Sequence, residues 1–115
     1  MGHLKEMTTG SKCDITVEYA KVPYLREVKN LAAAGVIPGG IYNNMNFVAE
    51  FVNYGNLPRT DQLLLCDAQT SGGLLIALPA HQAQLMLDEL HSKGLKEAVT
   101  IGSFTQKGEG VINVK

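Results

Sequence analysis

The stretch Asp67–Pro79, DAQTSGGLLIALP, joins a polar loop directly to an apolar run. Its first half holds small or polar residues and two adjacent glycines, which form helices and strands poorly. Its second half, Leu74–Leu78, is a short apolar run between a glycine and a proline, a pattern typical of a buried strand. The stretch therefore predicts a core strand over Gly73–Leu78 with a polar loop at its mouth.

The segments that precede and follow this stretch alternate between strand and helix patterns. CDITVEY, which ends at Tyr19, places apolar residues at every second position and predicts a strand. Apolar residues at helical spacing predict a helix over Tyr24–Ala34, opened by Pro23 and followed by Gly35. The same spacing predicts a second helix that proline opens at 79 and glycine closes at 94.

Three further segments complete the pattern. A short helix is predicted after the PGG turn at 38–40, with Asn43 or Asn44 as its N-cap, whereas the run LLLC fits either a strand or a helix. AVTIGSFTQ and VINV flank the glycine turn Lys107–Gly110 and are predicted to pair as a hairpin. The whole pattern predicts one α+β or mixed α/β domain over residues 1–115, with a mixed sheet whose helices pack on one face.

Composition places the chain among soluble globular proteins of one domain. It has 115 residues, of which 45% are hydrophobic and 18% charged, and its net charge is −1. Because no basic face or polybasic segment stands out, neither nucleic acid nor a membrane surface is an expected partner. No apolar run approaches the roughly 20 residues that span a bilayer, and MGHLKEM is not a signal peptide. A cytoplasmic location is expected.

Cysteine and histidine are too scattered to predict a metal site. Cys13 and Cys66 lie far apart and in no zinc-ligand spacing, so two free thiols are expected. His3, His81 and His91 have no histidine or cysteine three or four residues away. We therefore expect the chain to fold without a disulfide and without a bound metal.

The polar loop carries groups that suit an anionic ligand. Asp67 can accept N–H groups of its own turn, Thr70 and Ser71 carry hydroxyls, and Gly72–Gly73 allows a ligand to approach the backbone closely. The loop has neither the lysine of the GxxxxGK[ST] phosphate loop nor the spacing of GxGxxG. Two interpretations stay open, a structural turn or a ligand-facing loop. Asn44 is likewise a helix cap or a ligand contact.

Three motifs carry a family resemblance. DAQTSGGLLIALP resembles the DPQTSGGLL segment of selenophosphate synthetases (selenide, water dikinases), and VIPGGIYNN resembles their PGG turn followed by asparagine. GHLKEM resembles the second half of the segment that joins the two domains of that family. Ala68 replaces a frequent proline, and Ile41 stands where threonine or serine often follows PGG. The motifs extend over almost the whole chain.

The resemblance implies the C-terminal α+β sandwich of the aminoimidazole ribonucleotide synthetase superfamily. The family makes selenophosphate, AMP and phosphate from selenide, ATP and water, with Mg²⁺ on the polyphosphate and with its reactive residues in an N-terminal nucleotide-binding domain that this chain lacks. The resemblance also implies that ATP and selenide are partners of the full-length enzyme, which is a homodimer. For the isolated chain it implies no bound cofactor and no activity.

No residue of this chain stands at a catalytic or metal-binding position of the family. The resemblance implies instead that part of the chain lines the cleft where the phosphates lie. The residues expected to face this cleft are Asp67, Gln69, Thr70, Ser71, Gly72, Gly73, Gly2 and His3, with Gly39, Gly40 and Asn44 as a second set.

Two alternatives remain beside this function. One is a stand-alone binding or regulatory module of the same fold. The other is a domain of another superfamily member, such as aminoimidazole ribonucleotide synthetase, whose motifs the TSGGLL and PGG pair fits less well.

Overall fold

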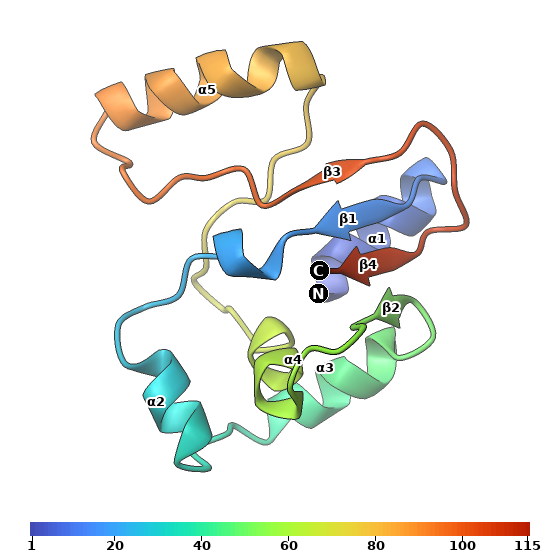
Figure 1. The fold of residues 1–115 in the computed structure, drawn as a ribbon, viewed down its shortest axis with the longest axis vertical. Helices are drawn as coiled ribbons and strands as arrows, with labels where there is room; N and C mark the ends of the chain where they lie inside the picture. Colours follow the sequence, from blue (N-terminus) through green and yellow to red (C-terminus); the bar gives the residue numbers. More distant parts are fainter.

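A four-stranded mixed sheet organises the chain, with the strand order β2-β4-β1-β3 (Figure 1). In this computed structural model, which describes all of residues 1–115, the strands are β1 (Ile15–Val17), β2 (Val52–Asn53), β3 (Gly102–Phe104) and β4 (Ile112–Val114). β4 is parallel to β1 and to β2, whereas β3 is antiparallel to β1. The strands of the sheet therefore come from both ends of the chain and from its middle.

Five α-helices and one 3₁₀ turn accompany the sheet. The helices are α1 (Gly2–Ser11), α2 (Val28–Ala33), α3 (Gly40–Val48), α4 (Arg59–Leu65) and α5 (Ala80–Ser92), and the turn covers Tyr19–Lys21. Helix α3 packs against α1 and against α4, α2 packs against α4, and α1 also contacts β4. None of these helices combines the length and the apolar character that a membrane-spanning helix requires.

One face of the sheet forms the core with α1, α3 and α4. The strands contribute alternate buried side chains, which meet buried residues of the helices; the cluster consists of Leu4, Ile15, Val17, Ile41, Met45, Val48, Val52, Leu63, Cys66, Ile112 and Val114. Full burial of one such aliphatic side chain contributes about 1.5–3 kcal/mol. The opposite face presents polar residues in register, Ser103, Thr16, Asn113 and Asn53. The predicted α+β class, a mixed sheet packed against helices, is confirmed.

The predicted C-terminal hairpin is wrong, although both of its strands exist. β3 and β4 do not pair with each other, because β1 lies between them. Asp14, directly before β1, accepts the backbone N–H groups of Gly110 and Val111 with its Oδ1 atom, at 3.0 and 2.8 Å. Its backbone carbonyl accepts the N–H of Thr105 at 2.9 Å. The loop between β3 and β4 is thus held around the beginning of β1, and its two strands separate.

The predicted strand over Gly73–Leu78 is also wrong. The segment makes no backbone–backbone hydrogen bond and runs as an extended connection from α4 to α5, drawn in yellow in Figure 1. Leu74 is 91% exposed and Ile76 is 48% exposed. An apolar run indicates a tendency toward burial, but it does not name a pairing partner. Here no strand of the sheet pairs with it.

One predicted helix is shorter than expected, and another occupies its predicted place. The helix expected over Tyr24–Ala34 begins only at Val28, and Tyr24 packs its ring 5.9 Å from that of Tyr19 instead of joining a helical turn. Leu25 is consequently 83% exposed. The predicted end is right, since Gly35 has a φ of +83°. α5 occupies its predicted place, but its apolar face is only half-buried.

The helix expected after the PGG turn begins inside that turn, at Gly40. Asn43 and Asn44 therefore lie within α3, and neither caps it. The helix ends at Val48, and Val52 belongs to β2. The ambiguous LLLC run is mostly helical, as the end of α4.

Helix α1 was not among the predicted elements. Leu4 and Thr8 lie one turn apart on its buried face. Lys5 places its ammonium 4.1 Å from the ring centre of Phe47 and 4.5 Å from that of Phe51, which binds the helix to the α3 region. The spacing of Leu4, Met7 and Thr8 was the available signal.

Candidate functional site

The polar loop Asp67–Gly73 begins where α4 ends inside the protein. Cys66, the residue that ends the helix, is only 1% exposed, and Asp67 is half-buried. The remaining residues of the loop are exposed. The loop is thus an exposed segment that begins at the inner end of α4. This end, Leu65 and Cys66, is called the root of the loop.

Three distant parts of the chain hold this root. The side-chain Nδ2 of Asn44, in α3, donates a hydrogen bond of 2.9 Å to the Cys66 carbonyl. The hydroxyl of Tyr54 lies 3.2 Å from the Cys66 sulfur. The amino group of Met1 donates to the Leu65 carbonyl at 3.1 Å. The loop therefore starts from a point that α1, α3 and the segment after β2 all contact.

Burial changes the acidity of one of these groups. Desolvation, followed by the hydrogen bond to Cys66, raises the pKa of Tyr54 above its ordinary value, so its phenol stays protonated at neutral pH. At neutral pH the Tyr54 hydroxyl therefore adds no negative charge to the root of the loop.

Within the loop, one glycine is required by packing and the other is not. The Gly72 N–H donates to the Gln69 carbonyl at 3.3 Å, and a Cβ at Gly72 would lie 2.7 Å from the Cβ of Gln69. A Cβ at Gly73 would meet nothing within 4 Å. The side-chain amide of Gln69 is bonded to Asp67. The turn is thus closed by Gly72, and open space lies beside Gly73.

The two hydroxyls of the loop are the free groups of this region. Thr70 and Ser71 are both exposed, and neither side chain makes a hydrogen bond within the chain. The side chains of Asp67 and Gln69 are joined by one hydrogen bond. The arrangement can therefore offer two neutral donors, together with unhindered backbone at Gly73, to a ligand outside the domain.

The remaining predicted site residues divide into two groups. Gly2 and His3 open α1 next to the end of α4, because Met1 bonds Leu65. The side chain of His3 is 96% exposed, 3.2 Å from Glu6. Gly39 and Gly40 begin α3, and a Cβ at either would meet nothing within 4 Å.

Asn44 is connected to the loop, but through the protein and not through a ligand. Its amide donor is used by Cys66, one residue before the loop. The interpretation of Asn44 as a helix cap is therefore wrong. The contributions of Asn44, Tyr54 and Met1 were missed because each contacts the root of the loop from a distant part of the chain, which sequence spacing does not show.

The side chains of this chain offer no cluster for a metal ion such as magnesium. No group of three or more histidine, cysteine, aspartate or glutamate side chains could hold a metal ion. The loop itself contains a single carboxylate, that of Asp67. The residues present do not fit a Mg²⁺ site, and only the neutral donors of the loop fit contact with phosphate oxygens.

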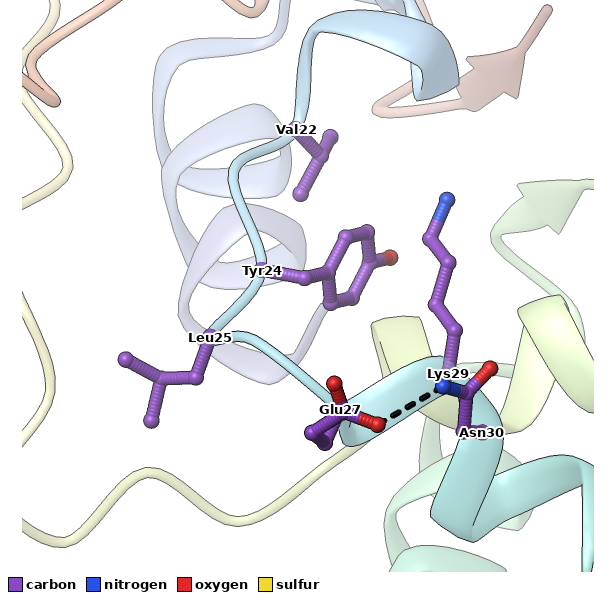
Figure 2. A pocket seen from close by; sticks show the side chains of 6 residues that line it. All are labelled: Val22, Tyr24, Leu25, Glu27, Lys29 and Asn30. Carbon is purple, nitrogen blue, oxygen red and sulfur yellow. Dashed lines mark hydrogen bonds between the residues drawn. The ribbon is translucent and has the colours of Figure 1, made fainter.

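A hollow lies apart from the predicted site residues. It has a volume of about 310 Å³ and is shown in Figure 2, lined by Val22, Tyr24, Leu25, Glu27, Lys29 and Asn30. The ammonium of Lys29 lies 4.8 and 5.0 Å from the ring centres of Tyr19 and Tyr24. Burial raises the pKa of Tyr24 to about 12. The two tilted rings and this cation lie beside the start of α2.

Comparisons with known proteins agree with the motifs. The family model described as AIR synthase related protein, C-terminal domain, matches residues 1–115. The chain is 38% identical over 119 residues to a selenide, water dikinase of Treponema denticola, an alignment that covers 99% of this chain and 33% of that protein. It is 41% identical over 115 residues to the selenide, water dikinase of Myxococcus xanthus, covering 99% of this chain and 32% of that protein.

The corresponding enzyme of Clostridioides difficile is 38% identical over 115 residues, with 99% of this chain and 33% of that protein covered. The chain thus spans about a third of the length of the curated relatives it matches. These similarities confirm the resemblance that the TSGGLL and PGG motifs indicated. Because the family model covers the whole chain, the chain belongs to the AIR synthase related protein family as its C-terminal domain.

Proposed function

We propose that this chain works as the C-terminal part of a selenide, water dikinase, an enzyme that makes selenophosphate from selenide, ATP and water. Its partner in this proposal is the N-terminal nucleotide-binding domain of the same polypeptide, in a cytoplasmic homodimer. The proposal is supported by the identity of about two residues in five to enzymes of that name.

The observation that carries the proposal is that the loop has unpaired hydroxyl donors while its root is held by the rest of the fold. Thr70 and Ser71 keep their hydroxyls unpaired beside the open backbone of Gly73, while the root of the loop is fixed. Neutral donors on a loop whose starting point is held suit the oxygens of a polyphosphate, since donors aimed at the ligand stabilise its charge. We infer that the loop forms one wall of the cleft that binds the ATP phosphates.

The role of this chain is then to bind and orient, and not to carry the chemistry. Its hydroxyls donate hydrogen bonds to phosphate oxygens, and its glycines keep side chains out of their way. The chain offers no cluster of carboxylates for Mg²⁺, so metal binding and nucleophilic attack belong to the other part of the enzyme in this proposal.

A chimera tests the function directly. The C-terminal third of the Clostridioides difficile enzyme is replaced by this chain, and selenophosphate is followed by phosphorus NMR with ATP, Mg²⁺ and selenide. We expect selenophosphate and AMP to form. The remaining two thirds of that enzyme without any C-terminal part is the control and should form neither. A well-folded chimera no better than this control would contradict the proposal.

A further inference from the structure

The root of the loop is held by contacts whose geometry determines where the loop points. The carbonyl of Cys66 and the N–H of Asp67 belong to one planar peptide unit. A hydrogen bond that fixes the direction of this carbonyl therefore also fixes the plane from which the loop departs. Asn44 makes that bond, at 2.9 Å.

Tyr54 fixes the same residue from another direction. Its hydroxyl lies 3.2 Å from the sulfur of Cys66, so the side chain and the carbonyl of this one residue are both engaged. The three preceding carbonyls also accept hydrogen bonds. Those of Leu63 and Leu64 accept the N–H groups of Cys66 and Asp67, and that of Leu65 accepts one from Met1. The helix end has little freedom to turn.

Both holding residues belong to rigid parts of the fold. Asn44 precedes the fully packed Met45 on α3, and Tyr54 follows β2, whose Val52 is buried in the core. Neither residue is part of the exposed loop. Their contacts therefore fix the start of the loop relative to the core. The loop itself makes only local hydrogen bonds.

We propose that Asn44 and Tyr54 are positioning residues that aim the loop Asp67–Gly73 at its ligand by holding Cys66. This inference rests on the proposed function, because the ligand is the polyphosphate that the loop would contact. Neither residue touches the ligand in this proposal. Their effect arises from the direction in which the loop leaves α4.

The first test measures the loop itself in the 115-residue chain. Asn44→Asp keeps the shape of the side chain and replaces the donor by an acceptor, whereas Asn43→Asp makes the same charge change at an exposed neighbour. We expect the amide NMR signals of Gln69–Gly73 to move in Asn44→Asp and to stay in place in Asn43→Asp. Loop signals that respond equally little to both changes would overturn the inference.

A second variant keeps the inference testable if Asn44→Asp does not fold. Tyr54→Phe removes only the hydroxyl that contacts Cys66, and Tyr42→Phe is the matched change on the exposed surface of α3. The signals of the loop should move in Tyr54→Phe alone. If they do not, Tyr54 has no positioning role, and the proposal fails for that residue.

The third test separates this inference from the proposed function. In the chimera, a displaced loop should lower kcat about tenfold or more while KM for ATP changes little, because small misplacements of binding groups cost mainly transition-state stabilisation. A moved loop with unchanged kcat supports positioning but overturns the phosphate-facing function. A lowered kcat with an unmoved loop overturns the positioning role.

Discussion

The hydroxyl of Thr8 donates a buried hydrogen bond of 2.9 Å to the carbonyl of Gly110, which joins the first helix to the turn that precedes the last strand. Thr8 is fully buried. Thr8→Val keeps the size of the side chain and leaves this carbonyl without its donor. We expect a loss of about 1–3 kcal/mol in the free energy of unfolding, measured by urea denaturation. The exposed neighbour serves as control, and Thr9→Val should change stability by less than about 0.5 kcal/mol.

The backbone conformation of Gly110 gives a second test. Its φ is +89°, and a Cβ there would lie 3.0 Å from the Cγ2 of Thr9. Gly110→Ala should therefore destabilise the chain by more than about 1 kcal/mol, because strain and crowding add. Gly39→Ala is the matched control, since its φ is −58° and a Cβ would meet nothing within 4 Å. Equal melting temperatures for the two variants would refute this account.

The extended segment before α5 gives the sharpest test of the fold. Leu74 is 91% exposed, whereas Ile112 is fully buried in β4. Leu74→Ser should leave the free energy of unfolding within about 0.5 kcal/mol of the original, whereas Ile112→Ala should cost about 2–5 kcal/mol. Urea denaturation of both variants shows whether the segment that contains Leu74 is exposed or buried. A loss at Leu74 comparable to that at Ile112 would mean that the segment is a buried strand, as its sequence suggested.

Local patterns of the sequence predicted local features of the fold. The alternation around Ile15 and Val17 identified β1, and Gly35 and Gly94 mark helix ends with positive φ, as expected. Pairing could not be predicted in this way. The hairpin expected across Lys107–Gly110 fails because Asp14, far away in the sequence, binds that loop and places β1 between its strands.

In the candidate site, too, local features could be predicted from the sequence and long-range contacts could not. The polar composition of Asp67–Gly73 was visible in the sequence, as was the PGG segment that contains the start of α3. The bond between Asn44 and Cys66 spans 22 residues, and that between Met1 and Leu65 spans 64. Such contacts depend on how helices pack, which spacing along one segment does not encode.

The isolated chain should have no activity of its own. With ATP, Mg²⁺ and selenide, we expect no selenophosphate from the 115 residues alone, because they contain no cluster of groups that could hold the metal. Phosphorus NMR measures the products, with the chimera as positive control. Selenophosphate and AMP from the pure chain would place the catalytic centre here and contradict the division of roles proposed above.

The hydroxyls of the loop give the most direct test of contact with phosphate. Thr70→Val and Ser71→Ala each remove one donor at little steric cost, and both side chains are exposed, so the fold should keep its melting temperature. Loss of a preorganised donor to developing charge costs about 2.7–4 kcal/mol in well-studied enzymes. We expect at least one variant to slow selenophosphate formation by the chimera about tenfold or more, which corresponds to about 1.4 kcal/mol.

Gly72 distinguishes this outcome from a purely structural turn. A Cβ there would lie 2.7 Å from the Cβ of Gln69, so Gly72→Val should disturb the turn whether or not a ligand is bound. If Gly72→Val slows the reaction while both hydroxyl variants keep the original rate, the loop serves the fold and its hydroxyls contact no phosphate. If a hydroxyl variant is slow at an unchanged melting temperature, the donor itself acts on the ligand, because the turn that carries it is intact.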